Sequence, residues 1–255
     1  MAVYKLIVAY DGTDYKGWQQ QKKGQKTISG ALRDTFCLIF HQKYVSVTGA
    51  SRTDAGVHAH GQVVRIITEL NLAPEKLLYA LNRALPEGIC VRSCQKVHEN
   101  FHPQHQVFLK IYTYRFFLEQ QLPCYDRYGY YIRRKFNLQA CKQALAVFVG
   151  THDFKLFCSE ETDRSTVKTI NEIIITPGKL SGEYVVIIKG QSFLRYMIRR
   201  IIGAAFALAI DSVRSSEELK ALLADTSLVA KNLPVAPAKG LCLEEIEYTH
   251  EYNLK

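Results

Sequence analysis

Residues 48–61 read Thr-Gly-Ala-Ser-Arg-Thr-Asp-Ala-Gly-Val-His-Ala-His-Gly, a short stretch that combines three glycines with an Arg, an Asp and two His. The segments on either side, 44–47 and 62–68, are rich in β-branched and aromatic residues and are predicted to be strands. Glycines between two strands permit positive φ angles or a close approach to a ligand. A polar loop that a rigid scaffold holds is a favourable place for chemistry, and Asp54 lies at its centre.

The composition indicates a globular protein and is compatible with a polyanionic partner. The chain has 255 residues, of which 47% are hydrophobic, and this is enough for a sizeable core. It carries 33 Lys and Arg against 24 Asp and Glu, a net charge of +9. Such an excess either serves solubility alone or attracts phosphates, from which basic side chains release counterions. The many tyrosines and phenylalanines could stack on bases.

No segment of the sequence resembles a secretion signal or a membrane span. The chain enters a strand-like run at once, and its longest apolar run, residues 201–210, is too short to cross a bilayer. The seven cysteines show no repeating pair spacing, and most lie in apolar runs, for example Cys141 and Cys242. We therefore expect small buried thiols, no membrane and a cytoplasmic protein.

The first hundred residues predict an alternating order of strands and helices. Strands are expected at 2–10, 44–47, 62–68 and 89–97. A helix beginning at Thr27 shows apolar residues at helical spacing, and a second begins at Pro74, where a proline is tolerated. The resulting β-α-β-β-α-β order is that of a split ferredoxin-like unit.

The rest of the chain predicts a second unit of the same class. A long strand is expected at 107–118, a helix from Asn137 to Gly150, and a hairpin of strands 170–176 and 183–189. Residues 190–203 are expected to open the longest helix, on which Arg195 and Arg199 would share a face. Ser215 is expected to cap a short helix, and the last strand begins at Gly240.

These patterns together predict an α+β fold. Two ferredoxin-like-related subdomains, residues 1–100 and 101–255, would each have a mainly antiparallel sheet backed by helices, with an active-site cleft between them.

Residues 51–59, Ser-Arg-Thr-Asp-Ala-Gly-Val-His-Ala, closely resemble the signature loop of the tRNA pseudouridine synthase A family. Members of that family isomerise uridine to pseudouridine in the anticodon arm of tRNA. The resemblance continues in the family's order through further segments, among them 10–21, 110–115, 150–157, 190–203 and 240–243. It implies the pseudouridine synthase fold, action on uridines 38, 39 and 40, a homodimer and no cofactor or metal. It also implies that Asp54 is the catalytic carboxylate.

The same resemblance implies roles for four other residues. Tyr112 matches the active-site aromatic of a basic-x-Tyr-x-Tyr strand, and Arg199 matches an arginine that pairs with the catalytic Asp. Leu241 matches a leucine near the target base, and Arg52 would contact the phosphate backbone or fill the gap left by a flipped base. A guanidinium near Asp54 would keep the carboxylate ionised.

Residues 98–106 form a polar connector in which the resemblance is partial. Phe101-His102 matches the family's Phe-His pair, but Pro103-Gln104-His105 departs from the Ala-Arg-Phe that follows it there. This departure weakens a phosphate-binding role for the segment. Cys94, His98, His102 and His105 could suggest a zinc site, but their spacing fits no common tetrahedral pattern, so we predict a solvated linker.

Two other functions remain open from the residues alone. A non-catalytic RNA-binding module would show the same charge and aromatics, with Asp54 only a turn residue. A hydrolase using Asp54 with His58 would release a base or phosphate, which an isomerase does not. We interpret His58 and His60 as structural residues. Nucleophilic attack, glycal formation and addition to the base all remain open as the role of Asp54.

Overall fold

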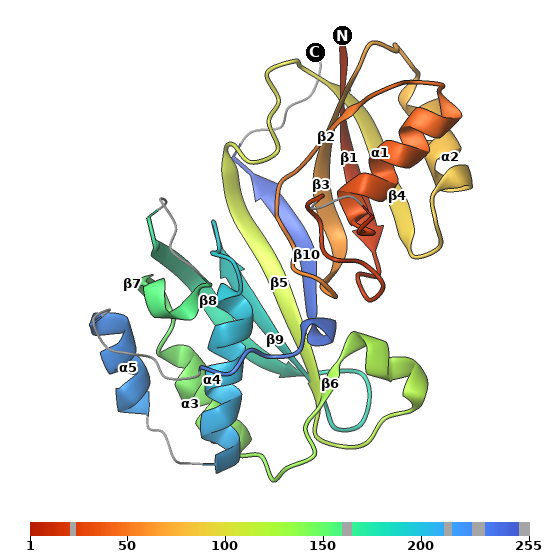
Figure 1. Cartoon of the computed structure of the whole chain (residues 1–255). Helices are drawn as coiled ribbons and strands as arrows, with labels where there is room; N and C mark the ends of the chain where they lie inside the picture. The colour runs from red at the N-terminus through yellow and green to blue at the C-terminus, as the bar shows by residue number, and fades with distance from the viewer. Residues whose placement is uncertain (21–23, 160–164, 212–215, 226–232, 250–255) are drawn as a thin grey trace. The chain divides into compact units, whose positions relative to one another are not determined.

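The computed structural model describes residues 1–20, 24–159, 165–211, 216–225 and 233–249, and has the predicted α+β class (Figure 1). The chain divides into two compact units. The first comprises Met1–Lys110 and the segment from Cys242 onward, and the second comprises Ile111–Leu241. The units are described separately below.

The first unit contains the predicted β-α-β-β-α-β order. Its elements are β1 (Ala2–Tyr10), α1 (Ile28–Ile39), β2 (Ser46–Gly49), β3 (His58–Thr68), α2 (Pro74–Ala84) and β4 (Ile89–Val97). Strand β1 is central and pairs antiparallel with both β3 and β4. Strand β2 pairs antiparallel with β3, and β10 (Leu241–Tyr248) pairs with β3 in parallel.

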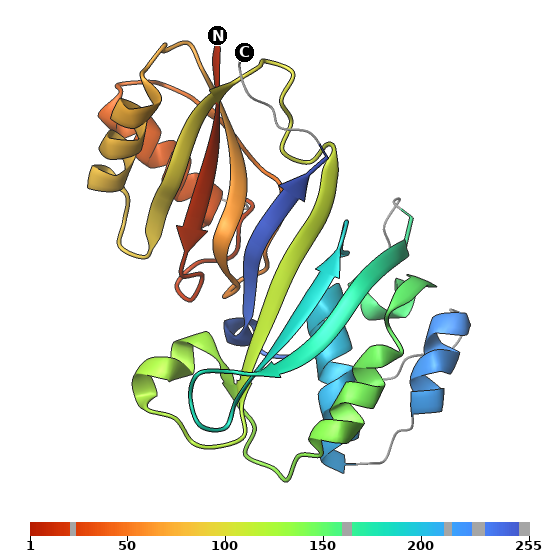
Figure 2. The same ribbon diagram turned by 180° about the vertical axis from the view of Figure 1, so that it is seen from behind.

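Local signals explain why these segments fold as they do. The Thr27 hydroxyl caps α1 by accepting a hydrogen bond from the backbone N–H of Gly30. Both helices cover one face of the sheet, as the two opposite views show (Figures 1 and 2). Alternate residues of β1, among them Leu6 and Val8, are fully buried, as are Leu32 and Leu77 of the two helices. The burial of these apolar residues forms the core of the unit.

The second unit is a twisted sheet with helices on one face (Figures 1 and 2). Its strands follow the order β5-β9-β8-β7, and β6 pairs with β5. The strands are β5 (Val107–Phe117), β6 (Tyr130–Tyr131), β7 (Gly150–Asp153), β8 (Val167–Pro177) and β9 (Glu183–Gly190). The helices are α3 (Leu138–Ala146), α4 (Met197–Asp211) and α5 (Ser216–Ala224), with short 3-10 turns at Pro123–Tyr128, Lys155–Phe157 and Ala238–Gly240. The first four residues of β5 belong to the first unit, and β10 contributes only Leu241 to the second.

Several predicted boundaries are wrong. Strand β3 begins at His58 rather than at residue 62, so the polar loop is shorter than expected. Helix α3 ends at Ala146, and Gly150, with φ +110°, begins β7 instead. Helix α4 begins at Met197 because Tyr196 adopts a left-handed conformation with φ +62°, which a right-handed helix cannot include. Arg195 therefore precedes the helix and shares no helix face with Arg199. The expected cap at Ser215 lies outside the described residues.

Within the described ranges, no helix is both long and apolar enough to cross a membrane.

Candidate active site

Asp54 lies in the loop between β2 and β3, the stretch 50–57 that we call the Asp54 loop. Thr53 is buried, Asp54 is half-buried, and Arg52 is exposed. A carboxylate in this position is reachable from outside while its neighbour is anchored in the unit. The loop can thus present Asp54 to a large ligand without moving.

The segment after β1 holds the Asp54 loop along one side. The backbone N–H of Trp18 donates to the carbonyl of Thr53 (3.1 Å), and that of Gly56 donates to the carbonyl of Tyr15 (3.3 Å). Gly17, with φ +90°, approaches so closely that a Cβ atom there would lie 2.7 Å from the Thr53 carbonyl oxygen. The sequence motif around Gly17-Trp18 therefore supports the loop that carries Asp54.

Side chains of β1 and β3 hold the other side of the loop. The Tyr10 and Thr53 hydroxyls are 2.8 Å apart in a buried hydrogen bond. Gln62 is fully buried and clamps Ser51 twice: its Oε1 accepts from the Ser51 N–H (3.1 Å) and its Nε2 donates to the Ser51 carbonyl (2.7 Å). Residues on both sides of Arg52 are thus fixed by hydrogen bonds, which limits the conformations available to Asp54.

Two further side chains bind the start of the loop. Lys110 Nζ donates to the carbonyl of Ala50 (2.9 Å), and Gln104 Nε2 donates to the carbonyl of Gly49 (3.0 Å). Burial of the ammonium group lowers the pKa of Lys110 from 10.5 to about 8. Gln104 belongs to the segment 103–105 that departs from the family pattern. Its side-chain amide thus supports the residue directly before the Asp54 loop.

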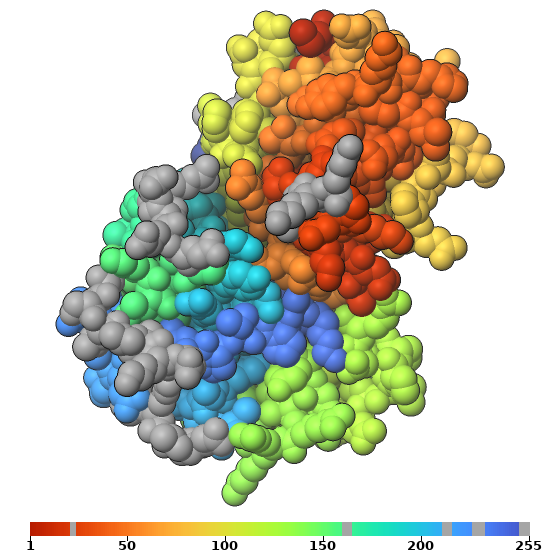
Figure 3. Space-filling view, viewed as in Figure 1, coloured from red at the N-terminus to blue at the C-terminus, as the bar shows by residue number. Residues whose placement is uncertain are grey.

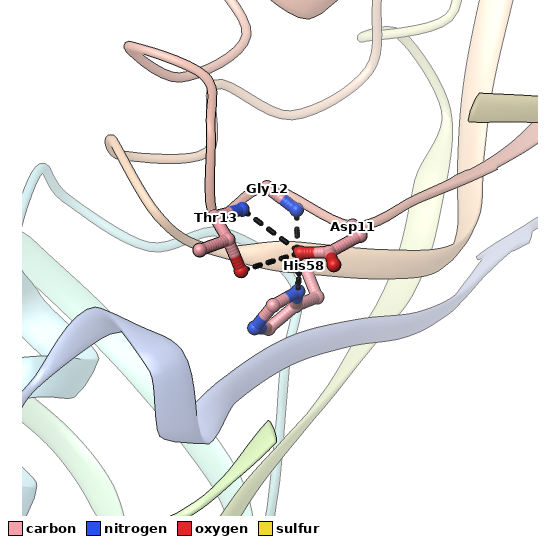
Figure 4. A network of polar contacts seen from close by, with 4 residues as sticks. All are labelled: Asp11, Gly12, Thr13 and His58. Carbon is pink, nitrogen blue, oxygen red and sulfur yellow. Dashed lines mark hydrogen bonds and ion pairs between the residues drawn. The ribbon is translucent and has the colours of Figure 1, made fainter. Parts of the chain in front are cut away.

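A polar network at the end of the loop involves His58 (Figure 4). Its Nδ1 atom lies 3.2 Å from the backbone nitrogen of Gly12 and 3.2 Å from Asp11 Oδ1. The same carboxylate oxygen accepts from the N–H and the hydroxyl of Thr13 (2.9 and 2.6 Å). Unprotonated Nδ1 accepts from Gly12, whereas protonated Nδ1 donates to Asp11. His58 therefore joins the Asp54 loop to the segment after β1, which agrees with a structural role.

Tyr112 lies in the second unit, on β5, and is only 5% exposed. The Tyr112 ring contacts the Phe193 ring edge to face, with ring centroids 5.4 Å apart and ring planes at 84°. Phe193 follows β9 and in turn packs on Gly190, where a Cβ atom would lie 2.9 Å from the ring. This contact restrains the orientation of the Tyr112 ring.

Arg199 lies in the first turn of α4 and is held by the segment before β10. Its Nε donates to the carbonyl of Ala236 (2.8 Å), and the Ala236 N–H donates to the Arg199 carbonyl (2.9 Å). The guanidinium carbon lies 5.1 Å from the centre of the Tyr196 ring, a cation–π contact. In Figure 3 this segment, in blue, lies beside the cyan residues around the start of α4. The Ala236 carbonyl and the Tyr196 ring together hold the Arg199 side chain in a defined orientation.

Leu241 is buried at the start of β10, directly after that segment. Tyr114 supports it: its hydroxyl donates to the carbonyl of Pro237 (3.0 Å), and its ring would be 2.6 Å from a Cβ atom at Gly240. Burial raises the pKa of Tyr114 well above its usual value, so the hydroxyl remains a donor. Arg199 and Leu241 are therefore positioned by neighbouring residues of one segment.

The five predicted site residues divide between the units. Arg52 and Asp54 share the loop of the first unit, whereas Tyr112, Arg199 and Leu241 belong to the second. The pairing of Asp54 with Arg199 joins the two units and stays a prediction. The sequence missed the supporting residues that hydrogen-bond to the site segments: Gln62, Gln104, Lys110 and Ala236. Only their polarity or position near a motif could have indicated them.

The connector at 98–106 is a stretch of turns that packs against its own unit. The rings of His102 and His105 stack with centroids 4.2 Å apart. Burial is the main cause of the lowered pKa of His102, and the nearby His105 and Arg65 lower this pKa further. In the part of the chain that the structure describes, Cys94, His98, His102 and His105 do not form a group of three or more converging metal donors.

The chain is similar to known proteins over nearly its whole length. The sequence model of a family described as tRNA pseudouridine synthase matches residues 6–106 and 144–249. The tRNA pseudouridine synthase A of Thermodesulfovibrio yellowstonii is 32% identical over 97% of this chain and 100% of that protein. Enzymes of the same name from Clostridium kluyveri and Aquifex aeolicus are 34% and 35% identical, each over 96% of this chain and 98% and 99% of their own lengths. The matched residues include both the Asp54 loop and Arg199, and the chain belongs to the tRNA pseudouridine synthase family.

Proposed function

We propose that this isomerase of the tRNA pseudouridine synthase family converts uridines 38, 39 and 40 of the tRNA anticodon stem-loop to pseudouridine, with Asp54 as its catalytic carboxylate. The observation that carries the proposal is the Asp54 loop. Hydrogen bonds to backbone and side-chain groups of the surrounding segments hold it, yet Asp54 remains half-buried at its centre. Such rigidity suits a catalytic group, which must keep its orientation through the reaction.

The reaction breaks the N1–C1′ bond, turns the uracil, forms a C5–C1′ bond and releases the C5 proton. It transfers no electrons and loses no group, so the chemistry calls for a carboxylate rather than a redox centre. Asp54 would attack the sugar or the base, or remove a proton from the sugar. Each role requires the ionised carboxylate.

The other site residues would bind the flipped nucleotide. Tyr112 would stack on the uracil and Leu241 would pack near it. Arg199 would pair with Asp54 and favour its charged form. Arg52 is exposed beside Asp54, and its planar guanidinium suits a phosphate or the gap that the base leaves in the stem.

The net charge of +9 supports a polyanionic substrate held through phosphates. We expect a cytoplasmic homodimer, as the family resemblance implies. Size-exclusion chromatography with light scattering tests the dimer separately from the chemistry. A monomeric enzyme with full activity would remove the dimer from the proposal and leave the reaction unchanged.

Tritium release from C5-labelled uridine in an unmodified tRNA transcript tests the catalytic assignment. The wild type should release tritium, Asp54→Asn should release none, and both should bind the tRNA with similar affinity. Asp34→Asn is the matched control, because Asp34 is an exposed aspartate of the same unit. Binding without release by the wild type would favour the RNA-binding module, and release by Asp54→Asn would place the catalytic carboxylate elsewhere.

Transcripts with a single uridine at position 38, 39 or 40 test the substrate assignment. Release from each of the three supports it. Release only from transcripts with uridine outside the anticodon stem-loop would contradict it.

A further inference from the structure

Three side chains with metal-binding atoms meet on the first unit, outside the Asp54 loop. They are His60 of β3 and Cys242 and Glu244 of β10. The parallel pairing of the two strands joins Cys242 to His58 and Leu243 to Ala59, so the next residue pair is Glu244 with His60. Because alternate residues of a strand share a face, Cys242 and Glu244 point to the same side of the sheet.

The donor atoms of this His60 cluster are already close together. His60 Nδ1 lies 2.7 Å from Glu244 Oε2, and all three ligand atoms lie within 4.8 Å of one another. His60 is exposed and Glu244 is half-buried, so an ion can approach the cluster from solvent. Among the described residues this is the one group of at least three converging donors.

Gly61 explains how the two strands come so near each other here. A Cβ atom at this position would lie 2.3 Å from the backbone oxygen of Glu244, which is too close for any side chain. The backbone on either side of the His60 cluster is thus held in place by close packing. A ligand set on such a backbone needs only side-chain rotations to close on an ion.

We propose that His60, Cys242 and Glu244 bind a zinc ion that links β3 to β10. Imidazole, thiolate and carboxylate are the three ligand types that zinc takes in proteins. Bonds of about 2.0–2.3 Å in a tetrahedron separate the donors by about 3.2–3.8 Å. The His60–Glu244 separation of 2.7 Å is shorter than this range and the other two do not exceed 4.8 Å, so shifts of about 1 Å or less would bring the donors to zinc-binding distances. Water would occupy the fourth position.

The zinc ion would act as a clamp rather than in the isomerisation. Strand β3 begins where the Asp54 loop ends, and β10 begins with Leu241. A metal ion bound by residues of both strands would hold the start of β3 and the start of β10 in their observed register. Without metal, the contact is an ion pair of His60 with Glu244, beside which Arg92 donates to the His60 carbonyl (2.9 Å). An exposed pair of this kind contributes little stability by itself.

Titration of the metal-free protein with cobalt(II), a spectroscopic substitute for zinc, tests the proposal. We expect one equivalent to give a thiolate-to-cobalt charge-transfer band with the intense visible absorption of tetrahedral cobalt, and zinc to bleach both. The site should tighten with rising pH, because the thiol and imidazole must lose their protons. No charge-transfer band with one equivalent of cobalt would overturn the proposal.

Variants identify the ligands. Cys242→Ser should abolish the band, and His60→Ala, at an exposed position that tolerates truncation, should weaken binding at least tenfold. Glu244→Gln should also weaken it, whereas the matched controls Cys90→Ser and Glu245→Gln, both at exposed positions, should leave it unchanged. A band that survives Cys242→Ser, or that Cys90→Ser removes, would place the ion elsewhere and refute the site.

Thermal unfolding provides a second measurement, which does not depend on activity. One equivalent of zinc should raise the midpoint of the wild type and leave that of His60→Ala unchanged, because only the native ligand set binds the ion. Equal shifts in both proteins would contradict the proposal. Pseudouridine formation by His60→Ala should remain, so this test is separate from that of the proposed function.

Discussion

The buried hydroxyl groups of Tyr10 and Thr53 lie 2.8 Å apart and connect β1 to the residue directly before Asp54. Tyr10 also lies 3.4 Å from the side-chain nitrogen of Gln62, which clamps Ser51. Tyr10 therefore contacts Thr53 directly and also contacts Gln62, which in turn binds Ser51. Its ring is 4% exposed, so water cannot easily replace the lost bond if the hydroxyl is removed.

Tyr10→Phe should lower the free energy of unfolding by about 1–2 kcal/mol, since Thr53 loses a buried partner. Turnover of tRNA should fall several-fold because Asp54 loses orientation, while tRNA affinity stays constant. Urea denaturation and single-turnover tritium release measure the two effects. Tyr79→Phe is the control, at an exposed tyrosine of α2. Unchanged turnover by Tyr10→Phe would show that the hydroxyl does not orient Asp54.

Gly12→Ala should disturb the end of the Asp54 loop. A Cβ atom at Gly12 would lie 2.0 Å from the carbonyl oxygen of Val57, so one of the two segments must move. We expect a loss of about 1–3 kcal/mol in unfolding free energy and a larger loss of turnover than of tRNA binding. Asp14→Ala, at an exposed position of the same turn, should leave stability within about 0.5 kcal/mol. Wild-type stability in Gly12→Ala would contradict the close approach.

Lys110 should make the stability of the protein rise with pH. Its pKa is about 8 in the folded state and 10.5 in the unfolded chain, so the unfolded chain binds more protons at pH values between the two. The penalty for burying the charge is fully present below pH 8 and is relieved as pH rises toward 10.5. Relative to Lys110→Met, the wild type should gain on the order of 1–3 kcal/mol across this window.

Urea denaturation of the wild type and Lys110→Met at pH 7 and pH 10 measures this difference. Lys142→Met serves as the control, because Lys142 is an exposed lysine of α3. Its difference from the wild type should not depend on pH. A Lys110→Met difference that is equally constant would mean that Lys110 keeps an ordinary pKa.

Arg199→Lys should reduce turnover at least tenfold although it keeps the charge. Lysine has no group at the position of Nε to donate to the Ala236 carbonyl. Arg195→Lys is a close control, because Arg195 lies over the same Tyr196 ring at 5.3 Å but is exposed in the turn before α4. We expect Arg195→Lys to lose less than threefold. Near-wild-type turnover of Arg199→Lys in a tritium-release assay would indicate that only the charge matters at this position.

Much of the fold follows from local signals in the sequence. Thr27 as a cap, Pro74 in a first turn and alternating apolar residues in 2–10 each act within a few residues. The order of elements in the first unit was therefore predictable. The start of α4 was not, because the helical spacing of Phe193 and Met197 continues across Tyr196, whose left-handed conformation ends the pattern. Phe193 instead packs on Tyr112.

The family, the α+β class and the polar loop that carries Asp54 could be recognised from the amino-acid sequence, because these depend on residues that are neighbours in the chain. Only the tertiary structure decided which groups hold that loop and which donors meet beyond it. Lys110 and Ala50 are 60 residues apart, and His60 and Glu244 are 184 apart. No local rule relates such pairs. His60 and Glu244 meet because β10 pairs with β3, and strand pairing is set by the packing of the whole unit.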